Sequence, residues 1–274
     1  TRLLFVGDST MLLLYDEAVR QLGGEDACPE TGPMTDEFCG LHDYYGFERA
    51  PWVAPAKHEG PEKKVLDKHG QYCTGCKCRG VLRTCTLDGS PAVSLELEFV
   101  PVEFALDVEH PTPTTRTSQE TLARFLRERA RRPPEVLLLT HGLHDQGLSR
   151  NYGAADFAAN VEGHLSLLRP LVRGPIVLVG LTHTRDARAD AKEGYKQNNA
   201  RIVEYNAALR EMVRALRERE GERRLTLLHT HAMSDVKFEL FEDNLHPQRV
   251  HYEMLWHILR NHVLDDAKHA AGAE

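Results

Sequence analysis

The chain has 274 residues, of which 41% are hydrophobic, and a formal net charge of −7. This length and composition suit one large domain over residues 1–274, and the acidic balance gives no basis for a nucleic-acid partner. No apolar run approaches the ~20 residues of a membrane-spanning helix, so we expect no membrane span. No signal peptide is recognisable. Because the chain begins at Thr1 without a methionine, we expect a trimmed or processed chain, so the lack of a targeting signal carries little weight.

The first third of the chain opens with regular structure and then loses it. The apolar run at 3–6 predicts a buried strand, and apolar residues at helical spacing predict a helix over 10–22. Residues 25–90 are rich in Gly, Pro, Cys and His and show no sustained periodicity, which indicates an irregular, Cys-rich insertion. A β-prone stretch follows over 93–106, interrupted by Pro101.

The rest of the chain alternates between amphipathic helices and short apolar strands. The periodicity predicts helices over 118–131, 156–168, 198–220 and 249–264, and strands over 136–140, 176–181 and 225–228. Short strands made only of Val, Ile and Leu are typical of a parallel sheet that is covered on both faces. The pattern therefore predicts an α/β fold, a three-layer α/β/α sandwich around a mostly parallel sheet.

Six cysteines lie between positions 28 and 85, and none follows. They are Cys28, Cys39, Cys73, Cys76, Cys78 and Cys85. An even set in one loop-rich segment favours disulfides and an oxidising compartment. The alternatives are a structural zinc ion held by Cys73-x2-Cys76-x-Cys78 with Cys85, or free thiols. No ligand set for a catalytic metal and no phosphate-binding or dinucleotide-binding loop occurs in the sequence, so we expect no metal and no cofactor.

Two short motifs at opposite ends of the chain indicate a serine nucleophile and its general base. Gly7-Asp8-Ser9 directly follows the first predicted strand, which sets Ser9 at a helix N-terminus, where backbone N–H groups can stabilise an oxyanion. Near the other end, Asp243-x-x-His246 can supply His246 as the base, oriented by Asp243. Each motif alone is also typical of a helix cap. Together, on an alternating α/β chain, they predict a catalytic triad of Ser9, Asp243 and His246.

Polar residues also follow two later strands of the predicted sheet. In open α/β sheets, sites form at the carboxyl ends of the strands, so we expect these residues to share one cleft with the triad. The candidates for substrate binding are Asp8, Asp145, His183 and Arg185.

The two motifs resemble the GDSL/SGNH hydrolase superfamily, and the likeness extends over nearly the whole chain. It implies a flavodoxin-like sandwich, a Ser/His/Asp triad, and an oxyanion hole built from the amide of the nucleophile, a glycine after the second strand, and a Gly-x-Asn-Asp block. Here the block reads Gly142-Leu143-His144-Asp145. The resemblance therefore implies Ser9, Gly142 and His144 as oxyanion-hole residues, with a neutral imidazole donating in place of the asparagine. The glycine of the second strand has no assignable counterpart.

Gly-Asp-Ser-Thr, the Gly-x-His block, the Cys-bearing insertion and the terminal Asp-x-x-His-Pro are similar to the PC-esterase-like branch of this superfamily. That branch includes NXPE-like, trichome-birefringence-like and sialate O-acetyltransferase-like proteins. The resemblance implies cofactor-free chemistry on O-acetyl groups of carbohydrates, by transfer or deacetylation, in the secretory pathway (Golgi lumen) or outside the cell. We expect an acylated carbohydrate or a small acyl ester as substrate. A non-catalytic glycan-binding domain with the same fold is the alternative.

Overall fold

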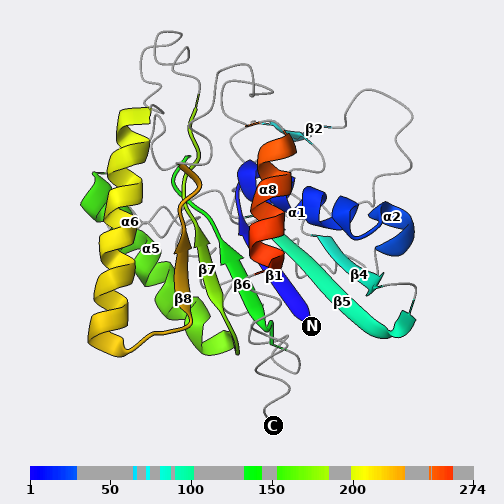
Figure 1. Ribbon diagram of the computed structural model, residues 1–274. Helices are drawn as coiled ribbons and strands as arrows, with labels where there is room; N and C mark the ends of the chain where they lie inside the picture. The colour runs from blue at the N-terminus through cyan, green and yellow to red at the C-terminus, as the bar shows by residue number, and fades with distance from the viewer. Residues whose placement is uncertain are drawn as a thin grey trace.

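The computed structural model describes residues 1–29, 64–66, 72–74, 81–87, 90–101, 133–143, 153–184, 199–231, 247 and 249–261. Its described elements form one layered α/β arrangement, drawn in Figure 1. Within these ranges no helix is long and apolar enough to cross a membrane.

A six-stranded sheet forms the centre, in the order β4-β5-β1-β6-β7-β8. The strands are β1 (Arg2–Gly7), β4 (Val81–Leu87), β5 (Ser90–Pro101), β6 (Val136–Leu139), β7 (Ile176–Val179) and β8 (Leu225–Leu228). All neighbouring pairs are parallel except β4 and β5, which pair antiparallel. A separate antiparallel pair is formed by β2 (Lys64–Leu66) and β3 (Tyr72–Thr74). The predicted mostly parallel sheet is confirmed.

Helices cover both faces of this sheet (Figure 1). They are α1 (Ser9–Gln21), α2 (Gly24–Ala27), α5 (Ala154–Leu168), α6 (Asn199–Glu220) and α8 (Arg249–Leu259), with a short 3-10 helix, η3 (Arg169–Leu171), after α5. The alternation of side chains along β1 sends Leu4 and Val6 to the core under α5 and α6, and Leu3 and Phe5 to the core under α1 and α8. The predicted three-layer sandwich is therefore confirmed.

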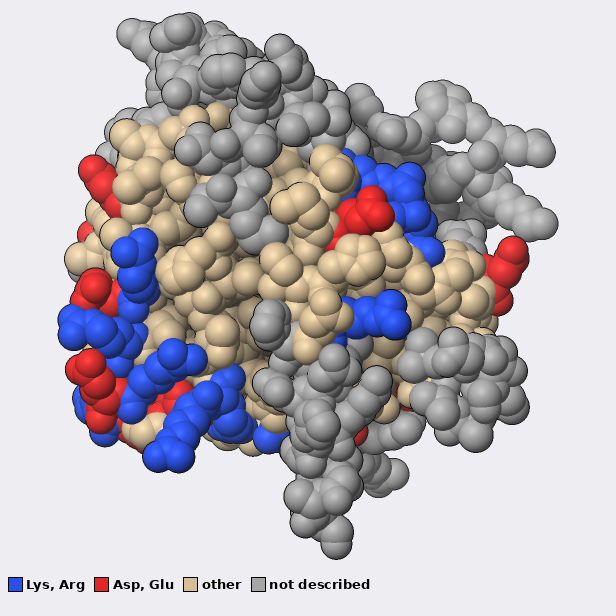
Figure 2. All heavy atoms as spheres, in the orientation of Figure 1, with Lys and Arg blue, Asp and Glu red and all other residues tan. Residues whose placement is uncertain are grey.

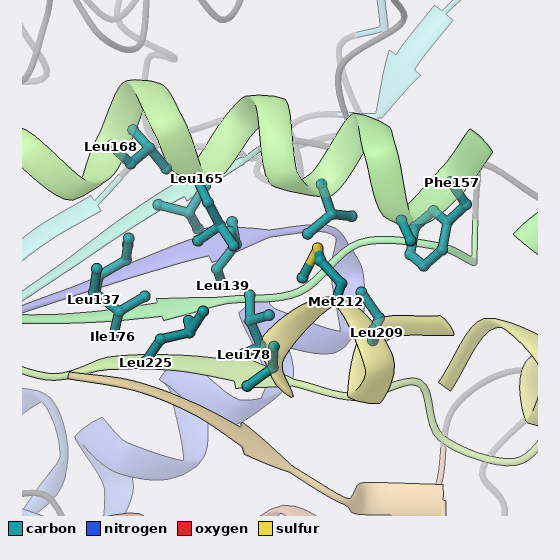
Figure 3. Close-up of a cluster of buried hydrophobic side chains, with 14 of the residues drawn as sticks. Leu137, Leu139, Phe157, Leu165, Leu168, Ile176, Leu178, Leu209, Met212 and Leu225 are labelled. Atoms are coloured by element: carbon teal, nitrogen blue, oxygen red, sulfur yellow. The ribbon is translucent and has the colours of Figure 1, made fainter. Parts of the chain in front are cut away.

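The first core is shown in Figure 3. Leucine and isoleucine side chains of β6, β7 and β8 meet one face of α5 and one face of α6; the labelled residues are Leu137, Leu139, Phe157, Leu165, Leu168, Ile176, Leu178, Leu209, Met212 and Leu225. Each is at most 7% exposed, and full burial of one such side chain stabilises the fold by roughly 1.5–3 kcal/mol. This packing fixes the carboxyl ends of three adjacent strands.

The second core joins α1 and α8 to the opposite face of the sheet. Tyr15 lies edge-on to Phe5 of β1, and Ala18 is fully buried. Leu255 and Trp256 of α8 belong to the same cluster. The helix that starts at Ser9 and the helix that starts three residues after His246 therefore pack on one face of the sheet, side by side (Figure 1).

One strand of the sheet lies in the stretch that the sequence pattern leaves irregular. β4 pairs with β5 over most of its length, from Val81 opposite Phe99 to Leu87 opposite Ser90. Its segment, Val-Leu-Arg-Thr-Cys-Thr-Leu, mixes apolar and polar side chains at an edge, so it lacks the purely apolar run of the central strands. The predicted helix over 118–131 lies outside the described residues.

Candidate functional site

The turn between β1 and α1 carries the proposed nucleophile. Ser9 is the first residue of α1, and Asp8 is its N-cap, with its carboxylate Oδ1 accepting a hydrogen bond from the Thr10 amide at 2.9 Å. Asp8 is 4% exposed, so its side chain is committed to the cap rather than presented to solvent. The first amides of a helix have no intrahelical acceptor, and the Ser9 amide belongs to this anion-binding set. The side chain of Ser9 lies outside what the structure describes.

The ends of β1 and β6 touch directly beside this turn. The Thr140 amide donates to the Val6 carbonyl at 3.0 Å. A Cβ atom on Gly7 would lie 2.6 Å from Thr140 Cγ2 and 2.9 Å from the Thr140 carbonyl oxygen, so only glycine permits this approach. The turn at Ser9 and the chain leaving β6 are therefore neighbours at the carboxyl edge of the sheet.

Gly142 follows β6 in a backbone conformation that requires glycine. Its φ is +124°, and a Cβ atom there would meet Leu181 Cδ2 at 2.8 Å and the Phe157 ring at 3.0 Å. Both the dihedral angle and the lack of space exclude other residues. The predicted oxyanion glycine thus lies in a tightly defined turn that follows β6, the strand adjacent to β1.

Directly before Gly142, His141 is hydrogen-bonded to His164 of α5, with 2.8 Å between His141 Nε2 and His164 Nδ1. Burial lowers the pKa of His141 well below its usual value, helped by His164, and burial lowers the pKa of His164 to about 4. Both rings are therefore neutral at pH 7. His141 Nδ1 and His164 Nε2 have no hydrogen-bond partner among the described residues. The pair anchors the start of the Gly142 turn to α5.

The carboxyl end of β7 carries His183, whose ring stacks on His231 beyond β8, with ring centroids 3.9 Å apart. Two asparagines of α6 hold this strand end by the same pattern. Asn206 accepts from the Leu181 amide at 2.8 Å and donates to its carbonyl at 2.9 Å. Asn199 does so with the Thr184 amide and carbonyl, both at 2.8 Å. His183 therefore lies between two fixed points of the backbone.

Three of the predicted strand-end segments come together. The ends of β1, β6 and β7 are consecutive in the sheet, which brings Ser9, Gly142 and His183 to one edge. Five predicted site residues, His144, Asp145, Arg185, Asp243 and His246, lie outside the described residues. Pro247, which follows His246, is buried. Among the described residues, no group of three His, Cys, Asp or Glu side chains could hold a metal ion.

Sequence reasoning missed the His141–His164 pair and the asparagine clamps. A usable signal was present for His164, because it lies on the buried stripe of α5 with Phe157, Val161 and Leu165. A polar residue on an apolar helical stripe needs a buried partner. Asn206 gives the same signal beside Tyr205 on α6.

Of the six cysteines, Cys28 and Cys85 form a disulfide, with both residues fully buried. It ties the end of α2 to β4 across 57 positions of the sequence. Cys39, Cys76 and Cys78 lie outside the described residues, as does the side chain of Cys73. The alternative zinc site with Cys85 as its fourth ligand is wrong, because Cys85 is bonded to Cys28; how the other four cysteines are used stays a prediction.

Comparison with known proteins identifies solved structures with the same fold as this chain. No protein-family model matches the chain, and no curated protein matches its sequence. Its arrangement of helices and strands is a three-layer α/β/α sandwich, as expected, and a solved structure shares this fold. A carbohydrate esterase family 3 structure from Talaromyces cellulolyticus matches over 98% of this chain and 98% of its own, with a TM-score of 0.50 and 11% identity.

Two further solved structures are similar to the chain. A lipase/acylhydrolase from Enterococcus faecalis matches 95% of this chain and 93% of its own, at 15% identity and a TM-score of 0.45. A family two carbohydrate esterase from Clostridium thermocellum, in complex with cellohexaose, matches 95% of this chain and 63% of its own, at 11% identity and a TM-score of 0.44.

Proposed function

We propose that this protein is a serine esterase of the SGNH type with Ser9 as nucleophile, His246 as general base and Asp243 as the residue that orients His246. The observation that carries the proposal is the juxtaposition at the sheet edge. Ser9 begins a helix whose N-terminal turn adjoins the end of β6, and β6 leads directly into the Gly142 turn. A nucleophile and a backbone turn of this kind on adjacent strands supply two parts of an acyl-transfer site.

In the proposed mechanism, Ser9 Oγ bonds to the ester carbonyl carbon while its proton passes to His246. The carbonyl oxygen becomes an oxyanion, held by the Ser9 amide together with Gly142 and His144. Collapse of this intermediate breaks the bond to the alcohol, which takes the proton from His246 and leaves an acyl-serine. Water or a sugar hydroxyl then releases the acyl group by the same steps in reverse. One oxyanion-hole donor is worth about 10²–10³ in kcat.

For the substrate we propose an O-acetyl group on a carbohydrate, in the manner of the PC-esterase-like branch. A carbohydrate esterase has the same fold, which supports this choice of substrate class. His183, Asp145 and Arg185 are the proposed substrate contacts, while Asp8 is assigned to the helix cap. The disulfide between Cys28 and Cys85 supports an oxidising location, the secretory lumen or the cell exterior.

The test of the nucleophile compares Ser9→Ala with Ser166→Ala. Ser166 is an exposed serine of α5 whose hydroxyl donates only to the Glu162 carbonyl, so its loss should leave activity unchanged. With p-nitrophenyl acetate, we expect Ser9→Ala to lose at least about 10³-fold in kcat, because triad residues act as a unit. Equal turnover by the two variants would refute the mechanism.

A fluorophosphonate probe separates an enzyme from a binding protein. We expect a covalent adduct at Ser9 in the unmodified chain and none in Ser9→Ala. If the unmodified chain forms no adduct but binds acetylated xylohexaose, the non-catalytic glycan-binding alternative is correct. Hydrolysis and transfer are then separated by supplying xylohexaose with p-nitrophenyl acetate and measuring the mass of the sugar: an acetylated product identifies a transferase, and free acetate alone identifies an esterase.

A further inference from the structure

Ion pairs join the two helices that adjoin the halves of the proposed triad. Arg249 Nε of α8 lies 3.3 Å from Glu17 Oε2 of α1. One turn further along α8, Glu253 Oε2 lies 3.8 Å from a terminal guanidinium nitrogen of Arg20 on α1. Glu17 and Arg20 also pair with each other. The four side chains therefore form a chain of three ion pairs with alternating charges, Arg249–Glu17–Arg20–Glu253, across the contact between α1 and α8.

Glu17 makes two of these three ion pairs and is the only buried member of the chain, with a side chain that is 3% exposed. Arg20 Nε donates to it at 2.8 Å and Gln21 Nε2 at 2.9 Å. Burial alone would raise the pKa of Glu17, but the hydrogen bonds from Arg20 and Gln21, with the charges of Arg20 and Arg249, lower it below its usual range. A carboxylate that stays charged while buried requires its cationic partners to remain in place.

The positions of these residues relate the chain of ion pairs to the proposed site. Ser9 is the first residue of α1, and Arg249 is the first residue of α8, three positions after His246. The apolar contact between the helices, made by Tyr15, Leu255 and Trp256 among others, is non-directional and permits small displacements. A charged contact with defined partner atoms restricts such displacements along the helix axis.

We propose that the Glu17–Arg249 ion pair is a positioning device that sets how the start of α8, and with it the residue His246, stands relative to Ser9. The proposal rests on the proposed function of Ser9 and His246. Glu17 and Arg249 are positioning residues: they act through α1 and α8 and take no part in bond making or breaking.

The kinetic test replaces Arg249 by Met and compares it with Arg214→Met. Arg214 is a matched control, since it is 64% exposed against 58% for Arg249 and pairs with Glu211 and Glu218 on α6, away from the site. On the left of Figure 2, basic and acidic side chains of this kind are interspersed over α6. We expect Arg249→Met to slow fluorophosphonate acylation of Ser9 and to lower kcat for p-nitrophenyl acetate about tenfold, with KM changed less than about twofold. Arg249→Lys should recover part of the loss.

A merely structural role would lower the melting temperature of Arg249→Met and leave the acylation rate of its folded fraction equal to that of Arg214→Met. That result overturns the proposal. Glu17→Gln provides a second variant that keeps the side-chain size and the hydrogen-bond acceptor. It should slow acylation to a similar degree, and Glu17→Gln combined with Arg249→Met should be no slower than either single variant, because both remove the same contact.

Amide hydrogen exchange over residues 249–259 gives a readout that does not depend on activity. We expect faster exchange in Arg249→Met than in Arg214→Met. If the unmodified chain is not acylated at Ser9, the proposed function fails, and the exchange data still decide whether the ion pair fixes α8. Unchanged exchange would show that the apolar contact alone holds the helix, and the positioning role would be wrong.

Discussion

Three buried histidines make the stability of this fold depend on mild acid. His141 and His164 form the hydrogen-bonded pair beside Gly142, and His251 is buried in α8 with neither ring nitrogen bonded to a described residue. Burial lowers the pKa of His164 and of His251 to about 4 each, and lowers that of His141 as well. Lowering the pH from 7 to 5 therefore tests how much these three histidines contribute to stability.

The free energy of unfolding falls as the pH is lowered, because the unfolded state binds protons before the folded state does. A histidine in the unfolded chain titrates near pH 6.5, above its folded value, so the unfolded state gains protons as the pH falls and the folded state does not. The contribution of each buried, neutral histidine to the free energy of unfolding is therefore complete above about pH 6.5. It is lost progressively as the pH falls towards 4. Between pH 7 and pH 5, a folded pKa of about 4 corresponds to a loss of roughly 1.8 kcal/mol for each of His164 and His251. His141 adds to the loss.

Equilibrium urea unfolding at pH 7, 6 and 5 measures this loss, and we expect the free energy of unfolding to fall by at least about 3–4 kcal/mol. Carboxylates such as Glu17, whose pKa is lowered from 4.5, contribute only at lower pH. His251→Phe should reduce the pH-dependent loss by roughly 1.8 kcal/mol, because it removes one of the two groups whose pKa is lowered to about 4. A drop below about 1 kcal/mol in the unmodified chain would refute the reasoning.

Three further predictions concern the strand ends and the disulfide. Gly142→Ala should lose about 2–4 kcal/mol of unfolding free energy in urea, since a Cβ would contact Leu181 at 2.8 Å in a left-handed backbone; Gly221→Ala, at φ +64° with nothing within 4 Å, should lose only about 1 kcal/mol. Equal losses would contradict this assignment. Asn206→Leu should cost about 2–4 kcal/mol in the same assay, because it leaves the amide and carbonyl of one residue unpaired in the core; a neutral effect would show that water replaces the amide. Cys85→Ser should cost up to about 4 kcal/mol, the entropy of a loop of 57 residues, and the cost should vanish when the unmodified chain is compared under reducing conditions.

The layered fold could be predicted because its signals are local. The strands β6 and β7 consist only of Val, Leu and Ile, and the helix after Ser9 shows its periodicity within 13 residues. The order of strand ends then follows from the topology of a parallel sheet. This reasoning brings Ser9, Gly142 and His183 to one edge without coordinates.

Other features depend on pairings that the sequence does not specify. His141 meets His164 only because α5 docks on β6, and Glu17 meets Arg249 across 232 positions of the sequence. The sequence pattern did not predict β4 for a related reason. Its polar and apolar side chains do not alternate regularly enough to distinguish this edge strand from the irregular residues before it. A polar residue on a buried helical stripe indicates that a partner exists, but only the packing of the helices identifies it.

The clamp between Asn199 and Thr184 has a consequence for engineering. The two residues flank the 14 positions 185–198, so the backbone that follows β7 and the start of α6 are joined by two hydrogen bonds on either side of this stretch. Changes of length between them do not need to be transmitted to β7 or α6, because the closure at the base is made by the clamp itself. The positions after Arg185, which is a proposed substrate contact, are therefore a natural place to graft a foreign peptide or to exchange segments, because the clamp holds the backbone next to His183.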